Sequence, residues 1–170
     1  MEHVEQARYS AGVHTTSGQD GRLDVKLSSP GTTLIQRVAI CFAAGVVGGL
    51  AVVLFSHVLF ALGISEQLGV REPVSLKSPD IYRPLFWGGL WGIPFGLLIK
   101  AVWRRLYLFG LLYFLAPVLA LFTIFLPLSG AGFAGLEHGG PLFTLYLLLV
   151  NLPFGITTAL VARAVIGKNP

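Results

Sequence analysis

Apolar residues in this chain come in long blocks that are separated by short polar stretches. Three stretches contain no Asp, Glu, Lys or Arg, namely residues 38–64, 106–136 and 139–162. An uncharged apolar stretch of about 18 residues or more is typical of a helix that crosses a membrane. The pattern therefore predicts an all-α integral membrane protein.

Four membrane-spanning helices are predicted, at residues 34–62, 84–103, 106–128 and 141–165. Thr33 and Gln36 have the spacing of a capping box at the start of the first helix. The second helix is the weakest, because its uncharged core, residues 85–99, would extend over only about 22 Å of a hydrocarbon layer of about 30 Å. It can still span if Arg83 and Lys100 extend their charged ends toward the membrane surfaces. Without it, three spans would place the two termini on opposite sides.

Residues 1–33 predict a different kind of segment. They are polar, rich in Gly, Ser and Thr, and follow neither the helical nor the strand period, as expected for a disordered tail. The domain organisation is thus a tail, 1–33, and a four-helix transmembrane domain, 34–166. Basic residues flank the first span, fill the turn between the second and third spans and follow the fourth, whereas the loop 130–140 has none. This distribution predicts that both termini are cytoplasmic.

The second and fourth spans share a short motif. Residues 92–96 (Gly-Ile-Pro-Phe-Gly) and 151–155 (Asn-Leu-Pro-Phe-Gly) are each followed by an arginine, Arg104 or Arg163, ten residues after the proline. Both spans run in the same direction in the predicted topology, so the motif indicates two parallel repeats of a helical hairpin. Chance similarity in a chain rich in Gly and Phe is the other explanation.

Glycines at four-residue spacing are candidates for close helix packing. They form one pair on the first span and a longer stripe on the second: Gly45, Gly49, Gly88, Gly92 and Gly96. Within lipid, small residues let helix backbones approach and so supply the packing. The stripes predict a contact between the first and second spans, and the alternative is a face that joins copies of the chain.

Three prolines and one amide lie near the middle of their spans and are candidates for a midplane site: Pro94, Pro117, Asn151 and Pro153. Proline frees a backbone carbonyl, and interrupted helices at this depth are typical of transporter sites. The absence of a charged residue at this depth argues against ion coupling. Packing, with Asn151 hydrogen-bonded to a neighbouring helix, is the alternative function for these residues.

His57, Glu137 and His138 are candidate ligands for a metal ion on the outer side, because the predicted topology places them toward that face. Their spacing matches no known metal motif. Solvated loop carboxylates and a histidine bonded to a backbone carbonyl explain the same residues without a metal.

Composition narrows the functions further. The chain is 54% hydrophobic and 12% charged, has a net charge of +4, and contains a single cysteine. One cysteine excludes an internal disulfide and a CxxC pair. The basic residues flank apolar spans, so no nucleic-acid partner is expected. No catalytic motif is present, and we predict no catalytic residue and no cofactor.

The chain resembles small four-span bacterial membrane proteins of unknown function. The similarity covers the four helices and not the tail, and its motifs are the glycine-rich first helix (44–50), the second helix with Trp91-Gly92 (88–95) and the glycine-containing fourth helix. In such families a histidine often precedes the glycine in the second and fourth helices, whereas here Asn151 takes the latter position. The resemblance implies a four-helix bundle in the bacterial inner membrane.

The leading hypothesis is a non-enzymatic inner-membrane protein, an accessory subunit or scaffold whose partners are the lipid bilayer and a larger membrane complex or further copies of itself. One alternative is a small oligomeric transporter or channel. A second is a membrane enzyme or binding protein with an outward-facing metal.

Overall fold

The computed structural model describes residues 32–167, and all regular structure among them is helical. The long helices are α1 (Leu34–Ala61), α3 (Tyr82–Val102) and α7 (Leu136–Ile166). The short helices are α2 (Ile64–Gln67), α4 (Leu106–Tyr113), α5 (Leu115–Ala120) and α6 (Leu126–Leu128). Two 3-10 turns, Trp103–Arg105 and Phe133–Gly135, and a π-helical segment, Leu121–Phe125, connect them. Nearly all of the predicted tail, residues 1–31, lies outside the described part.

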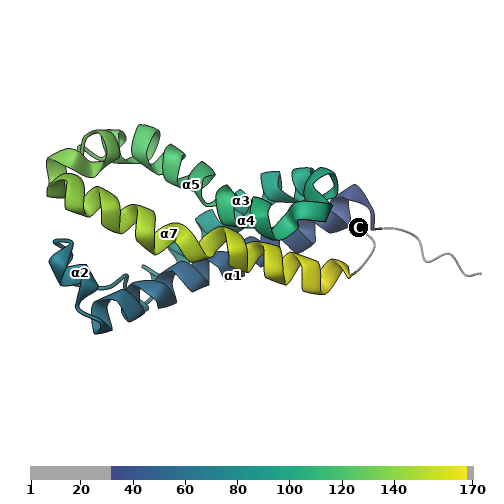
Figure 1. Cartoon of the computed structure of the whole chain (residues 1–170), viewed down its shortest axis with the longest axis horizontal. Helices are drawn as coiled ribbons and strands as arrows, with labels where there is room; N and C mark the ends of the chain where they lie inside the picture. The colour runs from purple at the N-terminus through teal and green to yellow at the C-terminus, as the bar shows by residue number, and fades with distance from the viewer. Residues whose placement is uncertain (1–31, 168–170) are drawn as a thin grey trace, which may run out of the picture. The chain divides into compact units, whose positions relative to one another are not determined.

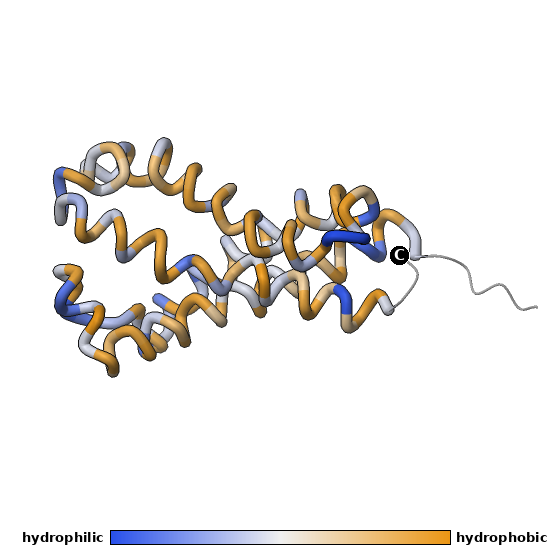
Figure 2. Tube along the Cα trace, viewed as in Figure 1, coloured by the Kyte–Doolittle hydropathy of each residue, from blue (hydrophilic) through white to orange (hydrophobic). Residues whose placement is uncertain are grey.

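Three helical stretches are long and apolar enough to cross a membrane: Leu34–Ala61, Tyr82–Leu128 and Phe133–Ile166. Hydrophobic residues predominate along each of these stretches, and hydrophilic residues are concentrated toward the ends (Figure 2). Large apolar side chains point outward, among them Leu54, Leu97 and Leu160, each about half exposed. Such a surface requires lipid rather than water around it, and the chain is therefore an all-α, multi-pass membrane protein.

The 47-residue stretch Tyr82–Leu128 reverses its direction at the 3-10 turn Trp103–Arg105 (Figure 1). The Tyr113 hydroxyl donates to the Trp91 carbonyl at 2.7 Å, and the rings of Phe95 and Phe109 lie 5.4 Å apart. The later residue of α3 thus contacts the earlier residue of α4, and the earlier contacts the later, so the two helices are antiparallel. Four separate membrane-length helices were predicted, but the structure has three such stretches because this turn continues the helical backbone.

The region predicted as the third span, 106–128, is not one regular helix. It divides into α4, α5, the π-helical segment and α6. Pro117 lacks a backbone N–H, and its ring clashes with the carbonyl four residues earlier, that of Tyr113, where α4 ends. Pro117, one of the candidate midplane prolines, thus interrupts the hydrogen-bond ladder of this region rather than only bending it.

The ends of the outer helices follow their sequence signals. Thr33 accepts a hydrogen bond from the Gln36 backbone N–H at 3.3 Å, and the Gln36 side chain accepts from the Thr33 N–H at 2.9 Å, so the predicted capping box is confirmed. In α7, Gly140 has φ +67° and interrupts the helical conformation, so the regular helix resumes at Pro141, the predicted start of the fourth span.

The α1, α3, α4 and α7 helices pack together around one core. The Phe95 side chain is fully buried and meets the Tyr113 ring edge-on, with centroids 4.9 Å apart. Phe154 of α7 and Cys41 of α1 are buried in the same cluster. A smaller cluster, Leu59, Tyr146 and Val150, joins the far end of α1 to α7.

Candidate binding cavity

Glycines place α1 and α3 in backbone contact. A Cβ atom on Gly45 would lie against the Gly88 carbonyl oxygen, and one on Gly92 would lie against the Cys41 carbonyl oxygen. A Cβ on Gly49 would come within 2.5 Å of the Pro84 oxygen. All three neighbours are backbone atoms, which have no rotamer by which to move away. Side chains are therefore excluded from this interface, and the two helices approach as closely as their backbones allow.

The same interface continues to the end of α3, where Gly96 packs against α1. A Cβ there would lie 3.0 Å from both the Cys41 Cβ and the Val38 Cα. The predicted glycine stripe thus lies between two helices of one chain along its whole length. This position leaves no part of the stripe on the outer surface, where a second copy of the chain would have to bind.

A second glycine contact joins α4 to α7. A Cβ on Gly155 would lie against the Gly110 carbonyl oxygen and 3.0 Å from the Phe114 nitrogen. A Cβ on Gly110 would lie 2.6 Å from the Ala159 Cβ. This contact was not predicted, because Gly110 and Gly155 form no stripe of glycines at four-residue spacing on their own helices.

Where the helices separate beyond these contacts, a cavity of about 440 Å³ opens between α3, α7, α1 and the broken helix that follows α4. Its volume lies within the range of small-molecule sites, about 300–1,000 Å³. Its walls are mostly aromatic and aliphatic. The lining residues are Gly49, Val52, Arg83, Pro84, Trp87, Gly88, Trp91, Pro117, Leu121, Phe125, Leu126, Ser129, Asn151 and Phe154.

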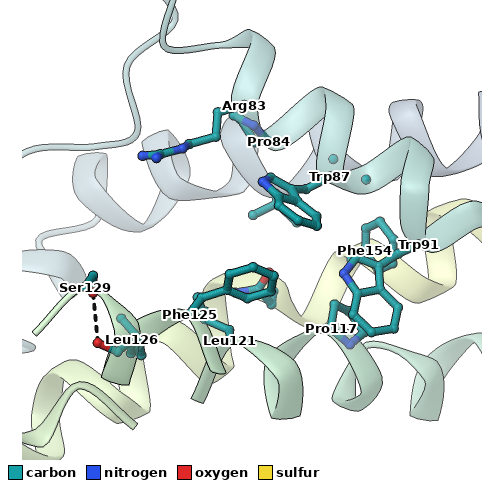
Figure 3. A pocket seen from close by; sticks show the side chains of 14 residues that line it. Arg83, Pro84, Trp87, Trp91, Pro117, Leu121, Phe125, Leu126, Ser129 and Phe154 are labelled. Atoms are coloured by element: carbon teal, nitrogen blue, oxygen red, sulfur yellow. Dashed lines mark hydrogen bonds between the residues drawn. The ribbon is translucent and has the colours of Figure 1, made fainter. Parts of the chain in front are cut away.

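The charged side chain of the cavity lies at one end (Figure 3). Arg83 and Ser129 lie toward one end, and Trp91 and Phe154 lie toward the other. Trp87 from α3 stands between these ends, opposite Phe125 of the π-helical segment, with ring centroids 4.8 Å apart. A ligand in this cavity would therefore meet aromatic surfaces over most of its length and a charged group at one end.

The irregular backbone of residues 114–128 forms one wall of the cavity. Pro117, Leu121 and Phe125 line it from α5 and the π-helical segment. A π-helical turn inside an α-helix is rare and is frequently found at functional sites. The interruption of this region therefore shapes the cavity, because a regular helix would present different side chains here.

Asn151 supplies a polar group from the middle of α7. Its Nδ2 donates to the Leu147 carbonyl at 2.8 Å, within its own helix. An amide side chain has a second N–H and a carbonyl oxygen, so this bond uses only part of its capacity. The predicted hydrogen bond to a neighbouring helix is not the one found, and Asn151 lines the cavity instead.

The structure separates the four residues of the predicted midplane site. Pro117 and Asn151 line the cavity together, whereas Pro94 and Pro153 do not line it. Both of the latter lie inside continuous helices, α3 and α7. Only two of the four residues therefore share a common space.

The structure does not bring the candidate metal ligands together. His57 Nδ1 lies 3.0 Å from the Val53 carbonyl oxygen in its own helix, and the His138 ring lies against Phe143, with centroids 5.4 Å apart. Glu137 packs against Gly132 in the connection before α7. Among residues 32–167, no three side chains of His, Cys, Asp or Glu form a group that could hold a metal ion.

The aromatic lining was not predicted from the sequence. Trp87 and Trp91 are four residues apart on one face of α3, a spacing that indicates a shared surface. Their partners across the cavity come from residues 117–126 and from Phe154 of α7, which no periodicity connects to α3. The sequence thus indicates the wall that α3 forms, through the spacing of Trp87 and Trp91, but it does not indicate the facing wall.

Comparison of the chain with protein-family models, with curated proteins and with solved structures finds no match.

Proposed function

We propose that the chain forms a four-span bundle in the bacterial inner membrane, with both termini on the cytoplasmic side. The reversal at Trp103–Arg105 supports two crossings within the stretch Tyr82–Leu128. Each half is long enough, since 21 residues of α3 extend about 31 Å and the lipid core measures about 30 Å. The basic residues Lys100, Arg104 and Arg105 all lie at this turn, which supports its location on the cytoplasmic side together with both termini.

The packing also supports two parallel hairpin repeats, the first built from α1 and α3 and the second from α4–α6 and α7. Gly96 and Gly155 are equivalent in the shared motif, and each packs against the preceding helix of its own hairpin. Phe95 and Phe154, which precede these glycines, are both buried in the central core. Equivalent residues thus make equivalent contacts, as a duplicated hairpin requires.

We propose a non-enzymatic role for this bundle, in which it binds an apolar or amphipathic small molecule as an accessory protein of the membrane. The cavity of about 440 Å³ between Trp87, Trp91, Phe125 and Phe154 carries this proposal. Sites that bind small molecules are mostly apolar and aromatic, with a few polar groups that fix orientation. Arg83, Ser129 and Asn151 supply these polar groups.

A variant that fills the cavity tests this proposal. Leu121→Trp adds an indole to the lining, whereas Leu119→Trp adds the same group to a side chain that is 59% exposed on the outer surface. Each full-length protein is purified in mild detergent, and small molecules extracted from it are quantified by mass spectrometry. We expect a molecule that is retained by the wild type and Leu119→Trp and is lost from Leu121→Trp. Equal retention by all three proteins, or none by the wild type, would contradict binding in this cavity.

The same purification tests the accessory role. An accessory subunit should be recovered with further membrane proteins in stoichiometric amounts. A solitary chain in mild detergent would remove this part of the proposal and leave ligand binding in place.

A small transporter or channel is the second candidate, and the position of Asn151 favours it. This amide reaches the cavity from the middle of α7, the depth at which transporters bind their substrates. The chain has one cysteine, Cys41, which is fully buried, so an Asn151→Cys variant in a Cys41→Ala background carries a single test thiol. Labelling of this thiol by a membrane-impermeant reagent in sealed vesicles would support a water path. Complete protection from both sides would contradict transport.

A further inference from the structure

One end of the described bundle is strongly basic. Five cationic residues lie there, at the start of α1, around the α3–α4 turn and near the end of α7: Arg37, Lys100, Arg104, Arg105 and Arg163. Contacts bring these elements together, since Gly96 packs against Arg37 and the Arg163 guanidinium lies over the Trp103 ring. The carboxylates of residues 32–167 all belong to the connections at the other end: Glu66, Glu72, Asp80 and Glu137. Within the described residues, the positive charge of this end is therefore not balanced by an acidic side chain.

The arginines at this end differ in their surroundings. Arg163 is half-buried and lies 5.1 Å from the Trp103 ring and 5.3 Å from the Tyr107 ring, so its charge already has aromatic partners. Arg104 and Arg105 are exposed and line a groove on the outside of the α3–α4 turn. These two are therefore exposed cations that share one groove.

The groove measures about 700 Å³ and combines this arginine pair with apolar side chains. Ala101, Leu108, Phe109 and Leu112 form its remaining walls together with Val102. Leu108 and Leu112 are 52% and 55% exposed, one helical turn apart on α4. Two more exposed leucines, Leu115 and Leu119, follow on α5, beyond the break at Phe114.

This apolar surface can accommodate much of an acyl chain. Along α4 the distance from Arg105 to Leu112 is about 11 Å, since each residue of a regular helix adds about 1.5 Å. One leaflet of the hydrocarbon layer is about 15 Å thick, half of about 30 Å. Leu108 and Leu112 therefore extend from the arginine pair through most of the depth of one leaflet.

We propose that Arg104 and Arg105 bind the phosphate of one anionic phospholipid whose acyl chain lies along Leu108 and Leu112. Guanidinium groups match phosphate geometry with paired N–H donors, which a single ammonium group does not. A free phosphate would use the arginines and leave the leucines without a partner, whereas a phospholipid uses both. The groove lies at the opposite end of α3 from the cavity, so this site does not depend on ligand binding there, although it rests on the proposed four-span topology, which places the turn at the membrane surface.

Titration of lipids onto the full-length protein tests the site. The protein is purified in a mild neutral detergent and titrated with phosphatidylglycerol or with phosphatidylcholine of the same acyl chains, and one-to-one complexes are counted by native mass spectrometry. We expect tighter binding of phosphatidylglycerol. In Arg104→Gln/Arg105→Gln this affinity should fall about 30-fold, and the preference over phosphatidylcholine should disappear.

Two controls separate a specific site from general attraction. Lys100→Gln removes a charge at the same end but outside the groove, and Arg71→Gln/Lys77→Gln removes two charges at the other end. Both should keep nearly the wild-type affinity for phosphatidylglycerol. If Arg104→Gln/Arg105→Gln is not recovered in a folded form, the two single variants are compared with Lys100→Gln in the same way.

Three outcomes would contradict the proposed phospholipid site. An equal loss of binding free energy per charge removed in the groove variant and in the Lys100→Gln control would show that total charge, rather than the groove, attracts the lipid. Binding of glycerol phosphate with the affinity of phosphatidylglycerol would show that the leucines take no part. Either result, or equal binding of the two phospholipids by the wild type, would overturn the proposal.

Discussion

Replacing Gly92 by alanine tests the backbone contact between α1 and α3, on which the bundle depends. The added Cβ would lie against the Cys41 carbonyl oxygen, 2.8 Å from the Cys41 carbonyl carbon and 2.9 Å from the Phe42 Cα. Ordinary carbon contacts are about 3.5–4.0 Å, so the helices would have to separate by more than about half an ångström. Such overpacking costs about 1–3 kcal/mol, and the higher values are expected where only backbone can move.

Helix propensity acts in the opposite direction and must be subtracted. Alanine is favoured over glycine within a helix by about 1 kcal/mol. We therefore expect Gly92→Ala to lower the free energy of unfolding by about 1–2 kcal/mol. Gly89→Ala is the matched control on the same helix, because its Cβ would meet side-chain atoms of Phe42 and Val46 at 2.8–2.9 Å, which can turn aside. Its net effect should be close to zero.

Unfolding of each protein in mixed micelles, followed by tryptophan fluorescence, measures both changes. A Gly92→Ala variant as stable as Gly89→Ala would refute the argument that backbone contact holds α1 against α3. The oligomeric mass of a Gly92→Leu variant, measured by native mass spectrometry, provides a second test. A folded Gly92→Leu chain that has only changed its oligomeric mass would show that the stripe joins copies of the chain rather than helices within one chain.

Three further substitutions test other contacts. Tyr113→Phe removes the hydroxyl that donates to the Trp91 carbonyl at 2.7 Å and should lower the free energy of unfolding by about 1 kcal/mol, whereas Tyr107→Phe, whose ring is 48% exposed, should change it little under the same denaturation. Arg163→Gln removes the cation from the Trp103 and Tyr107 rings and should cost about 0.5–2 kcal/mol, with Arg163→Lys between it and the wild type; equal stability of all three proteins would exclude this contribution. Ser56→Ala removes the buried hydroxyl that accepts from the Val74 N–H at 3.1 Å, so amide hydrogen exchange should become faster around residue 74 and stay unchanged in α3; unchanged exchange at both places would show that this bond does not hold the loop.

Local signals predicted the ends of the helices well. The Thr33 and Gln36 capping box starts α1, and Pro141 follows the non-helical Gly140 within α7. Both signals act over a few neighbouring residues, so their effect is visible in the sequence. The charge-free blocks likewise identify a multi-pass membrane protein, because lipid imposes the same requirement on every crossing residue.

The third span was harder to predict, because its irregularity depends on how one proline is accommodated. Pro94 and Pro153 stay within continuous helices, whereas Pro117 lies in the first turn of α5 and α4 ends four residues before it, at Tyr113. All three prolines lie in apolar surroundings, and composition does not distinguish them. Neighbouring helices decide whether the freed backbone groups are compensated within a helix or by a break.

The cavity could be predicted only in part. Trp87 and Trp91 are of a residue type that prefers the membrane interface, so their presence near the start of a span gives no reason by itself to expect a cavity. Their partners, Phe125 and Phe154, belong to two other segments of the chain. Residues that far apart in sequence meet only through the packing of α3, α7 and the π-helical segment, and a single sequence holds no periodic signal for such a meeting.

The most direct test of the four-span topology is the accessibility of single cysteines in oriented vesicles. In a Cys41→Ala background, thiols are placed at exposed positions before α3, at the α3–α4 turn and at the start of α7, with Glu72→Cys, Arg105→Cys and Glu137→Cys. A membrane-impermeant maleimide should label residue 105 from the cytoplasmic side, and residues 72 and 137 from the opposite side. Labelling of residues 72 and 137 from opposite sides, with residue 105 protected, would show that Tyr82–Leu128 crosses the membrane only once and would contradict the four-span bundle.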